Sequence, residues 1–139
     1  MTAMNSSSTK RLLIASLAAL VVMGLLAFAS AYIPGAKNLT AGALGHVDPV
    51  NSLVTAIAMC LGGYLGGKRF IGMALLLMVV MWIATIIVML QVGTQVEAKT
   101  LASVLAFNRS QILFSLLAAT AGASIGAWLR MKREPAQAQ

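Results

Sequence analysis

Four stretches of the chain are each about as long as a bilayer is thick, and none of them contains a charged residue. They cover residues 12–33, 50–67, 70–90 and 111–129. A helix needs about 20 mostly apolar residues to cross the hydrocarbon core, and backbone groups in lipid must be paired within the segment. The two-residue alternation of a membrane β-barrel is absent. The sequence therefore predicts an all-α polytopic membrane protein with four transmembrane helices.

Composition excludes the main soluble classes. The chain has 139 residues, of which 60% are hydrophobic and 9% are charged. Soluble domains are about 45–50% apolar and about 25% charged, and disordered tails are less apolar still. We expect one domain without a separate catalytic unit. Its predicted parts are a short polar tail over residues 1–11, a helical domain over 12–130 and a second tail over 131–139.

The basic residues predict the orientation of the four helices. Three of them, Lys37, Lys99 and Arg109, fall in the two longer connections, whereas the other seven fall beside the opposite helix ends. Those seven are Lys10, Arg11, Lys68, Arg69, Arg130, Lys132 and Arg133. Because cytoplasmic flanks carry the excess of Lys and Arg, we predict two antiparallel hairpins in a bacterial inner membrane with both termini cytoplasmic. The same residues predict contact with anionic lipids, and no nucleic-acid partner.

The first stretch has a competing interpretation as a secretory signal. A basic start, an apolar run and Ala27-Phe28-Ala29 resemble such a signal with its cleavage site. The apolar run is longer than the roughly 7–15 residues typical of a signal, which favours a retained anchor. Cleavage would leave three helices and an outside N-terminus.

Small residues recur near the ends of the second and fourth stretches. They are Gly62, Gly63, Gly66, Gly67, Ala118, Gly122 and Gly126. Small residues four apart make a flat helix face that another helix can approach closely. The partner face is either a second chain or the other helix of the same chain. A shift of 60 residues superposes Gly62 on Gly122 and Gly66 on Gly126, which indicates an internal duplication or merely the frequency of small residues in membrane helices.

A set of polar residues at the opposite helix ends is the best candidate for a site. It comprises His46, Asp48, Asn51, Asn108, Arg109 and Gln111. Asp48 and Arg109 would pair across the mouth of the bundle, or Asp48 would act as an N-cap before Pro49. The chain after Glu97 lacks Pro and Gly as far as Ala121, which favours a fourth helix extended towards Leu101.

The remaining reactive residues predict neither a metal nor a cofactor. His46 is the only histidine and Cys60 the only cysteine, whereas a metal site needs three or four convergent ligands. Cys60 lies mid-helix without an activating base. The methionines of the third stretch, among them Met78 and Met81, would line a flexible groove or face lipid.

The function predicted from these features is non-catalytic. No side chain within the four stretches is suited to acid–base or nucleophilic chemistry. We expect an accessory, scaffold or assembly subunit of the membrane that packs through its Gly/Ala helix faces, as a homo-oligomer or with another membrane protein. The alternative is a homo-oligomeric transporter or channel for a neutral or anionic solute.

Overall fold

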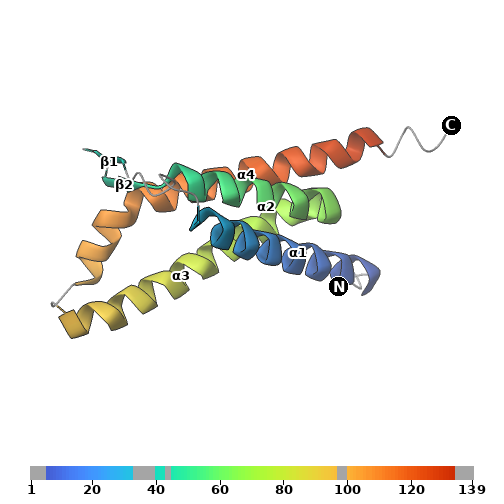
Figure 1. Ribbon diagram of the computed structural model, residues 1–139. Helices are drawn as coiled ribbons and strands as arrows, with labels where there is room; N and C mark the ends of the chain where they lie inside the picture. Colours follow the sequence, from blue (N-terminus) through green and yellow to red (C-terminus); the bar gives the residue numbers. More distant parts are fainter. Residues whose placement is uncertain (1–5, 33–39, 43–44, 97–99, 134–139) are drawn as a thin grey trace.

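The computed structural model describes residues 6–32, 40–42, 45–96 and 100–133. These residues form four α-helices, a short 3₁₀ turn and a two-stranded ladder (Figure 1). The elements are α1 (Ser6–Ser30), β1 (Thr40–Gly42), β2 (Gly45–Val47), α2 (Pro49–Gly66), η1 (Gly67–Arg69), α3 (Phe70–Val96) and α4 (Leu101–Arg133). The protein is therefore helical, as predicted. The antiparallel β1–β2 ladder was not predicted.

Among the residues that the structure describes, three helical stretches are long and apolar enough to cross a membrane. They are Ser7–Ser30, Pro49–Val92 and Leu101–Arg133. The second stretch has 44 residues and contains α2, η1 and most of α3, because these three elements follow one another directly along the chain. The structure thus shows three such stretches where the sequence predicts four.

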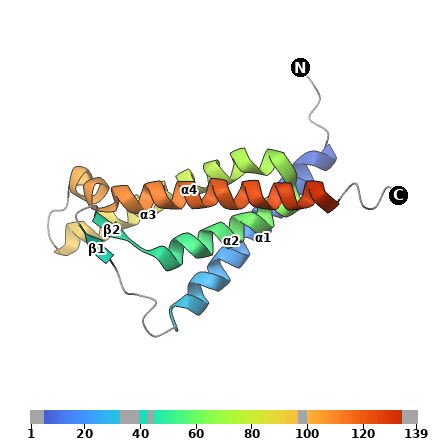
Figure 2. The same cartoon turned by 90° about the horizontal axis from the view of Figure 1, so that it is seen from above.

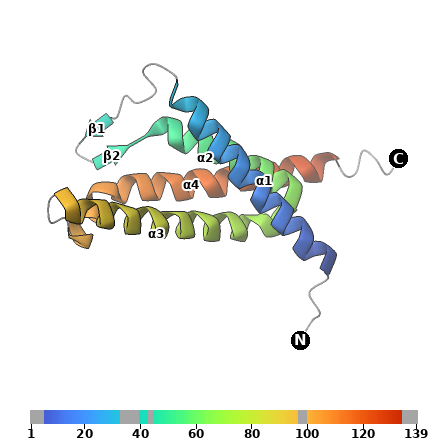
Figure 3. The same cartoon turned by 60° about the horizontal axis from the view of Figure 1, so that its bottom comes forward.

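The centre of the fold is the pair α2 and α4. These two helices share the most extensive contact in the molecule, followed by α1 with α2 and α3 with α4. Figure 2 shows α2 along α4, and Figure 3 shows α1 crossing α2 while α3 lies beside α4. The core contains small side chains, such as Ala58, Ala119 and Ala123, together with Met59 and Phe70. Because the side chains are small, the helix backbones lie close together.

The ends of α2 are encoded locally. Asp48 is the N-cap, and its Oδ1 accepts a hydrogen bond from the backbone N–H of Asn51 at 3.0 Å. Pro49 follows at the first helical position, where its missing N–H costs nothing. At the other end Gly67 has φ 69° and ψ −159°, a region that essentially only glycine adopts. The chain turns back between α2 and α3 (Figure 2).

Helix boundaries differ from the predicted stretches where the helices leave the apolar region. α1 begins at Ser6 and α4 ends at Arg133, so both helices continue into residues predicted to be tails. The predicted extension of the fourth helix is confirmed, because α4 begins at Leu101. The predicted boundaries of the helices were set by hydrophobicity alone. Backbone hydrogen bonding can continue a helix into polar residues beyond the apolar stretch.

Candidate functional site

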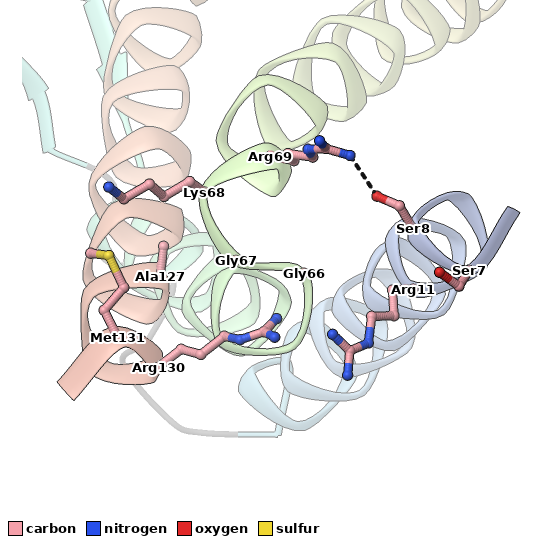
Figure 4. A pocket seen from close by; sticks show the side chains of 10 residues that line it. All are labelled: Ser7, Ser8, Arg11, Gly66, Gly67, Lys68, Arg69, Ala127, Arg130 and Met131. Atoms are coloured by element: carbon pink, nitrogen blue, oxygen red, sulfur yellow. Dashed lines mark hydrogen bonds between the residues drawn. The ribbon is translucent and has the colours of Figure 1, made fainter. Parts of the chain in front are cut away.

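A cleft opens at the end of the bundle where α1 begins, η1 turns and α4 ends. We call it the basic cleft; its volume is about 560 Å³, and Figure 4 shows it from close by. Four cationic side chains line it, namely Arg11 from α1, Lys68 and Arg69 from η1, and Arg130 from α4. Ser7 and Ser8 line it as well, and none of its described lining residues is acidic. The cleft is therefore a concave surface of positive potential.

Hydrogen bonds fix two of the arginines in this cleft. Arg69 Nη1 donates to Ser8 Oγ at 2.8 Å, which joins η1 to α1. Arg130 Nη1 donates to the carbonyl oxygen of Leu65 at 2.9 Å, which joins α4 to the last turn of α2. Figure 4 shows the bond between Arg69 and Ser8, and the Arg130 side chain extending from α4 towards the turn at Gly66 and Gly67. The cleft is thus assembled from three separate parts of the chain.

Two aromatic side chains contact the cationic side chains at the end of α4. Lys132 Nζ lies 4.0 Å from the centre of the Trp128 ring. Arg133 Nη1 donates to the hydroxyl of Tyr64 at 3.1 Å. Trp and Tyr are enriched where a membrane meets water, because their rings are apolar and their tips are polar. This end of the bundle has the composition of a membrane interface.

A second hollow lies between the helices, with a volume of about 320 Å³. We call it the polar groove. All four helices contribute to it, with Leu20, Met23, Gly24, Ala27, Asn51, Thr55, Met78, Met81, Trp82, Thr85 and Ser115 as its lining. Trp82 Nε1 donates to Ser115 Oγ at 2.7 Å, and that hydroxyl in turn donates to the carbonyl oxygen of Ile112 at 2.9 Å. The groove therefore presents hydroxyl and thioether groups without a charge.

The polar residues predicted as an outer cluster are only partly brought together. Gln111 Oε1 accepts the backbone N–H of Asp48 at 2.6 Å, and this links α4 to the start of α2. Gln111 is 4% exposed, and its Nε2 is buried without a hydrogen-bond partner in the described structure. The backbone N–H of Asn51 donates to Asp48 Oδ1, so Asn51 lies at the same end of α2. The side chain of His46 is outside the described residues.

Asn108 and Arg109 are adjacent in sequence but lie in different environments. Asn108 is 5% exposed, and its Nδ2 donates to the carbonyl oxygen of Val104 at 2.9 Å. Arg109 is exposed. Within the part of the chain that the structure describes, it forms no ion pair with Asp48, whose carboxylate caps α2 instead. The predicted alternative of an Asp48–Arg109 pair is therefore not seen, and the capping alternative is.

The small residues predicted to pack helices together contact other helices of this same chain. A methyl group on Gly63 would collide with the carbonyl oxygen of Ala123, and one on Gly122 with that of Ala56. Gly126 is placed in the same way against Cys60. These three glycines thus allow backbone contact between α2 and α4.

The other predicted small residues serve different contacts. Gly62 lies under the Phe70 ring and Gly66 against the Phe70 and Ala15 side chains, so both accommodate α1 and α3. Gly67 makes the turn, and Ala118 is half-buried beside the fully buried Ala119.

Several of the important residues were missed by sequence reasoning. Phe70 is fully buried against Gly62, although the sequence marked it only as the start of a helix. Ala119, Ala123 and Ala127 of α4 are also buried, and Ala123 lies against Gly63 of α2. Their spacing of four was the available signal, and it is displaced by one residue from the predicted Ala118. Ser8 gave no signal, because it joins the basic cleft only through folding.

The described residues contain no group of three or more His, Cys, Asp or Glu side chains placed to bind a metal ion. Comparisons of the chain with protein-family models, with curated proteins and with solved structures found no match. The features of the molecule that bear on its function are therefore the basic cleft, the polar groove and the packing of α2 against α4.

Proposed function

We propose that this chain is a non-catalytic integral membrane protein that acts as an accessory, scaffold or assembly subunit. The observation that supports the proposal is the construction of the core. Its buried polar side chains, within the described residues, are Ser16, Thr55, Asn108, Gln111 and Ser115, which are all uncharged. Most of them bond to the backbone of their own helix. Such a core provides a frame for packing against other proteins and holds no charged side chain for chemistry among the described residues.

The proposed arrangement in the membrane has four spanning helices in two antiparallel hairpins. Its support is the turn at Gly67, which divides the 44-residue apolar stretch into two helices that are each long enough for a bilayer. We further propose that the basic cleft faces the cytoplasm of a bacterial cell, with both termini on that side, because basic residues favour that side of the inner membrane.

The two parts of this proposal have separate tests. For topology, reporter domains fused after Lys68 and after Gln139 should both report the cytoplasm, and an outside signal from either would contradict the arrangement. For function, native mass spectrometry of the protein extracted gently from its own membrane should show a second protein in a fixed ratio. Recovery of this chain without another protein would contradict the accessory role.

A homo-oligomeric transporter or channel for a neutral or anionic solute is the second candidate. The polar groove favours it, since all four helices contribute to a hollow with hydroxyl groups and no charge. Solute flux into vesicles containing the purified protein tests this role. The flux should fall on Ser115→Leu, which fills the groove, and stay unchanged on Ser103→Leu, which lies at an exposed position in α4. Absence of flux in the unmodified protein across neutral and anionic solutes would rule the candidate out.

A further inference from the structure

We propose that the basic cleft binds the phosphate of an anionic phospholipid headgroup. The inference relies on the proposed membrane placement and is independent of the accessory role. Four cationic side chains from α1, η1 and α4 line one concave surface, and no acidic side chain is among its described lining residues. Like charges gathered in this way repel one another, and an anion bound between them removes that repulsion.

The cleft offers hydrogen-bond donors as well as charge. Ser8 Oγ accepts a hydrogen bond from Arg69, so the hydroxyl hydrogen of Ser8 remains to be donated to a phosphate oxygen. A guanidinium group has five N–H donors in a planar fork that matches phosphate. Arg69 therefore has donors beyond the one directed at Ser8. The bond between them also orients the guanidinium before a ligand arrives, which lowers the entropic cost of binding.

The position of the cleft favours a lipid over a soluble phosphate ester. It lies at the end of the apolar helices, where Trp128 and Tyr64 give the surface the composition of a membrane interface. Ala127 and Met131 line its α4 side beside the cations, so apolar surface for the first methylene groups of an acyl chain adjoins the phosphate-binding groups. Basic pockets between spanning helices on the cytoplasmic side are a known type of site for anionic headgroups.

The test variant neutralises cations on both sides of the cleft without breaking a bond within the protein. Arg11 and Lys68 line the cleft, on α1 and on η1, and the side chain of neither forms a hydrogen bond with another described residue. The double variant Arg11→Gln with Lys68→Gln therefore removes two charges and preserves the bonds of Arg69 and Arg130. Lys10→Gln with Lys132→Gln is the charge-matched control, because it removes two charges from the same end of the bundle but outside the cleft lining, while it also removes the contact of Lys132 with Trp128.

Binding is measured by native mass spectrometry of the purified full chain in detergent. The probes are phosphatidylglycerol, phosphatidylcholine with the same acyl chains, and inorganic phosphate. We expect the unmodified protein to retain phosphatidylglycerol more strongly than phosphatidylcholine. The cleft variant should lose roughly 25-fold in affinity, since each of its two basic residues near an anionic lipid contributes about a factor of five. The control variant should lose clearly less.

The outcomes separate the proposal from its alternatives. Equal loss in the cleft and control variants would show general surface attraction and overturn the site, as would equal retention of the two lipids by the unmodified protein. Displacement of phosphatidylglycerol by inorganic phosphate would show that the same groups bind free phosphate. It would assign the site to a soluble phosphate ester and overturn the lipid proposal. Retention of the lipid in the presence of inorganic phosphate would assign the site to a lipid headgroup. Because the measurement uses this chain alone, its result does not depend on whether a partner protein exists.

Discussion

Replacing Gly126 with alanine tests whether α2 and α4 are held together by direct backbone contact. The added Cβ would lie 2.7 Å from the backbone nitrogen of Tyr64 and 2.8 Å from the carbonyl carbon of Cys60. Carbon atoms pack favourably at about 3.5–4.0 Å. Both neighbours are backbone atoms, so no side chain can rotate away, and the two helices must separate by about 0.7 Å or more.

The expected cost follows from this displacement. Overpacking of a close-packed core costs about 1–3 kcal/mol, whereas alanine in place of glycine within a helix contributes up to about 1 kcal/mol of stability. Gly24→Ala isolates the second contribution, because Gly24 is also within a helix and a Cβ there would meet no atom within 4 Å. We expect Gly126→Ala to be less stable than Gly24→Ala by about 1–3 kcal/mol.

The free energy of unfolding can be measured for both variants in mixed micelles, by titrating dodecyl sulfate and following circular dichroism at the helix band. Gly72→Ala is a second control, since its Cβ would also enter open space. Equal stability of Gly126→Ala and the two controls would refute backbone contact between α2 and α4. A loss as large in Gly24→Ala would instead show that any extra methyl group disturbs the protein.

Three further expectations concern single contacts. Gly67→Ala should lower the free energy of unfolding by about 1–3 kcal/mol in the same titration, because φ 69° and ψ −159° are essentially restricted to glycine. An unchanged midpoint would contradict the turn geometry. Gln111→Ala should speed amide hydrogen exchange at Asp48, whose N–H loses its acceptor, and unchanged exchange would show that the link is absent in solution. In bilayers, brominated lipids should quench Trp82 best with bromine deep in the acyl chains and Trp128 best with bromine near the headgroup, measured in variants that keep one tryptophan. The reverse order would contradict the proposed placement.

Much of the helical structure could be predicted because the signal is long and simple. Uncharged stretches of the required length predicted α-helices, and Asp48 followed by Pro49 predicted the start of α2 to within one residue. The ends of α1 and α4 could not be predicted in this way, because helical hydrogen bonding extends past Arg11 and Leu129 into polar sequence. Local signals therefore predicted where apolar helices lie and left their full lengths open.

The candidate sites were harder to predict, since they depend on which helix faces meet. The sequence placed Asn108 and Arg109 in one cluster, yet adjacent helical residues are about 100° apart around the axis, and one is buried while the other is exposed. Arg69 and Ser8 are 61 positions apart and meet through a hydrogen bond. Neighbours in sequence can thus face different surroundings, and a cleft assembled from distant segments leaves no local pattern.

The pairing of α2 with α4 also has a consequence for how the protein is made. The whole of α3 separates these two helices in the chain, so the ribosome completes α2 well before it synthesises the face of α4 that carries Gly122 and Gly126. At about 5–20 residues per second this interval lasts several seconds. During this interval the α2 face around Gly63, which packs against the backbone of α4 in the finished fold, has no α4 to contact. A product truncated before α4 would therefore lack the principal interface of the fold.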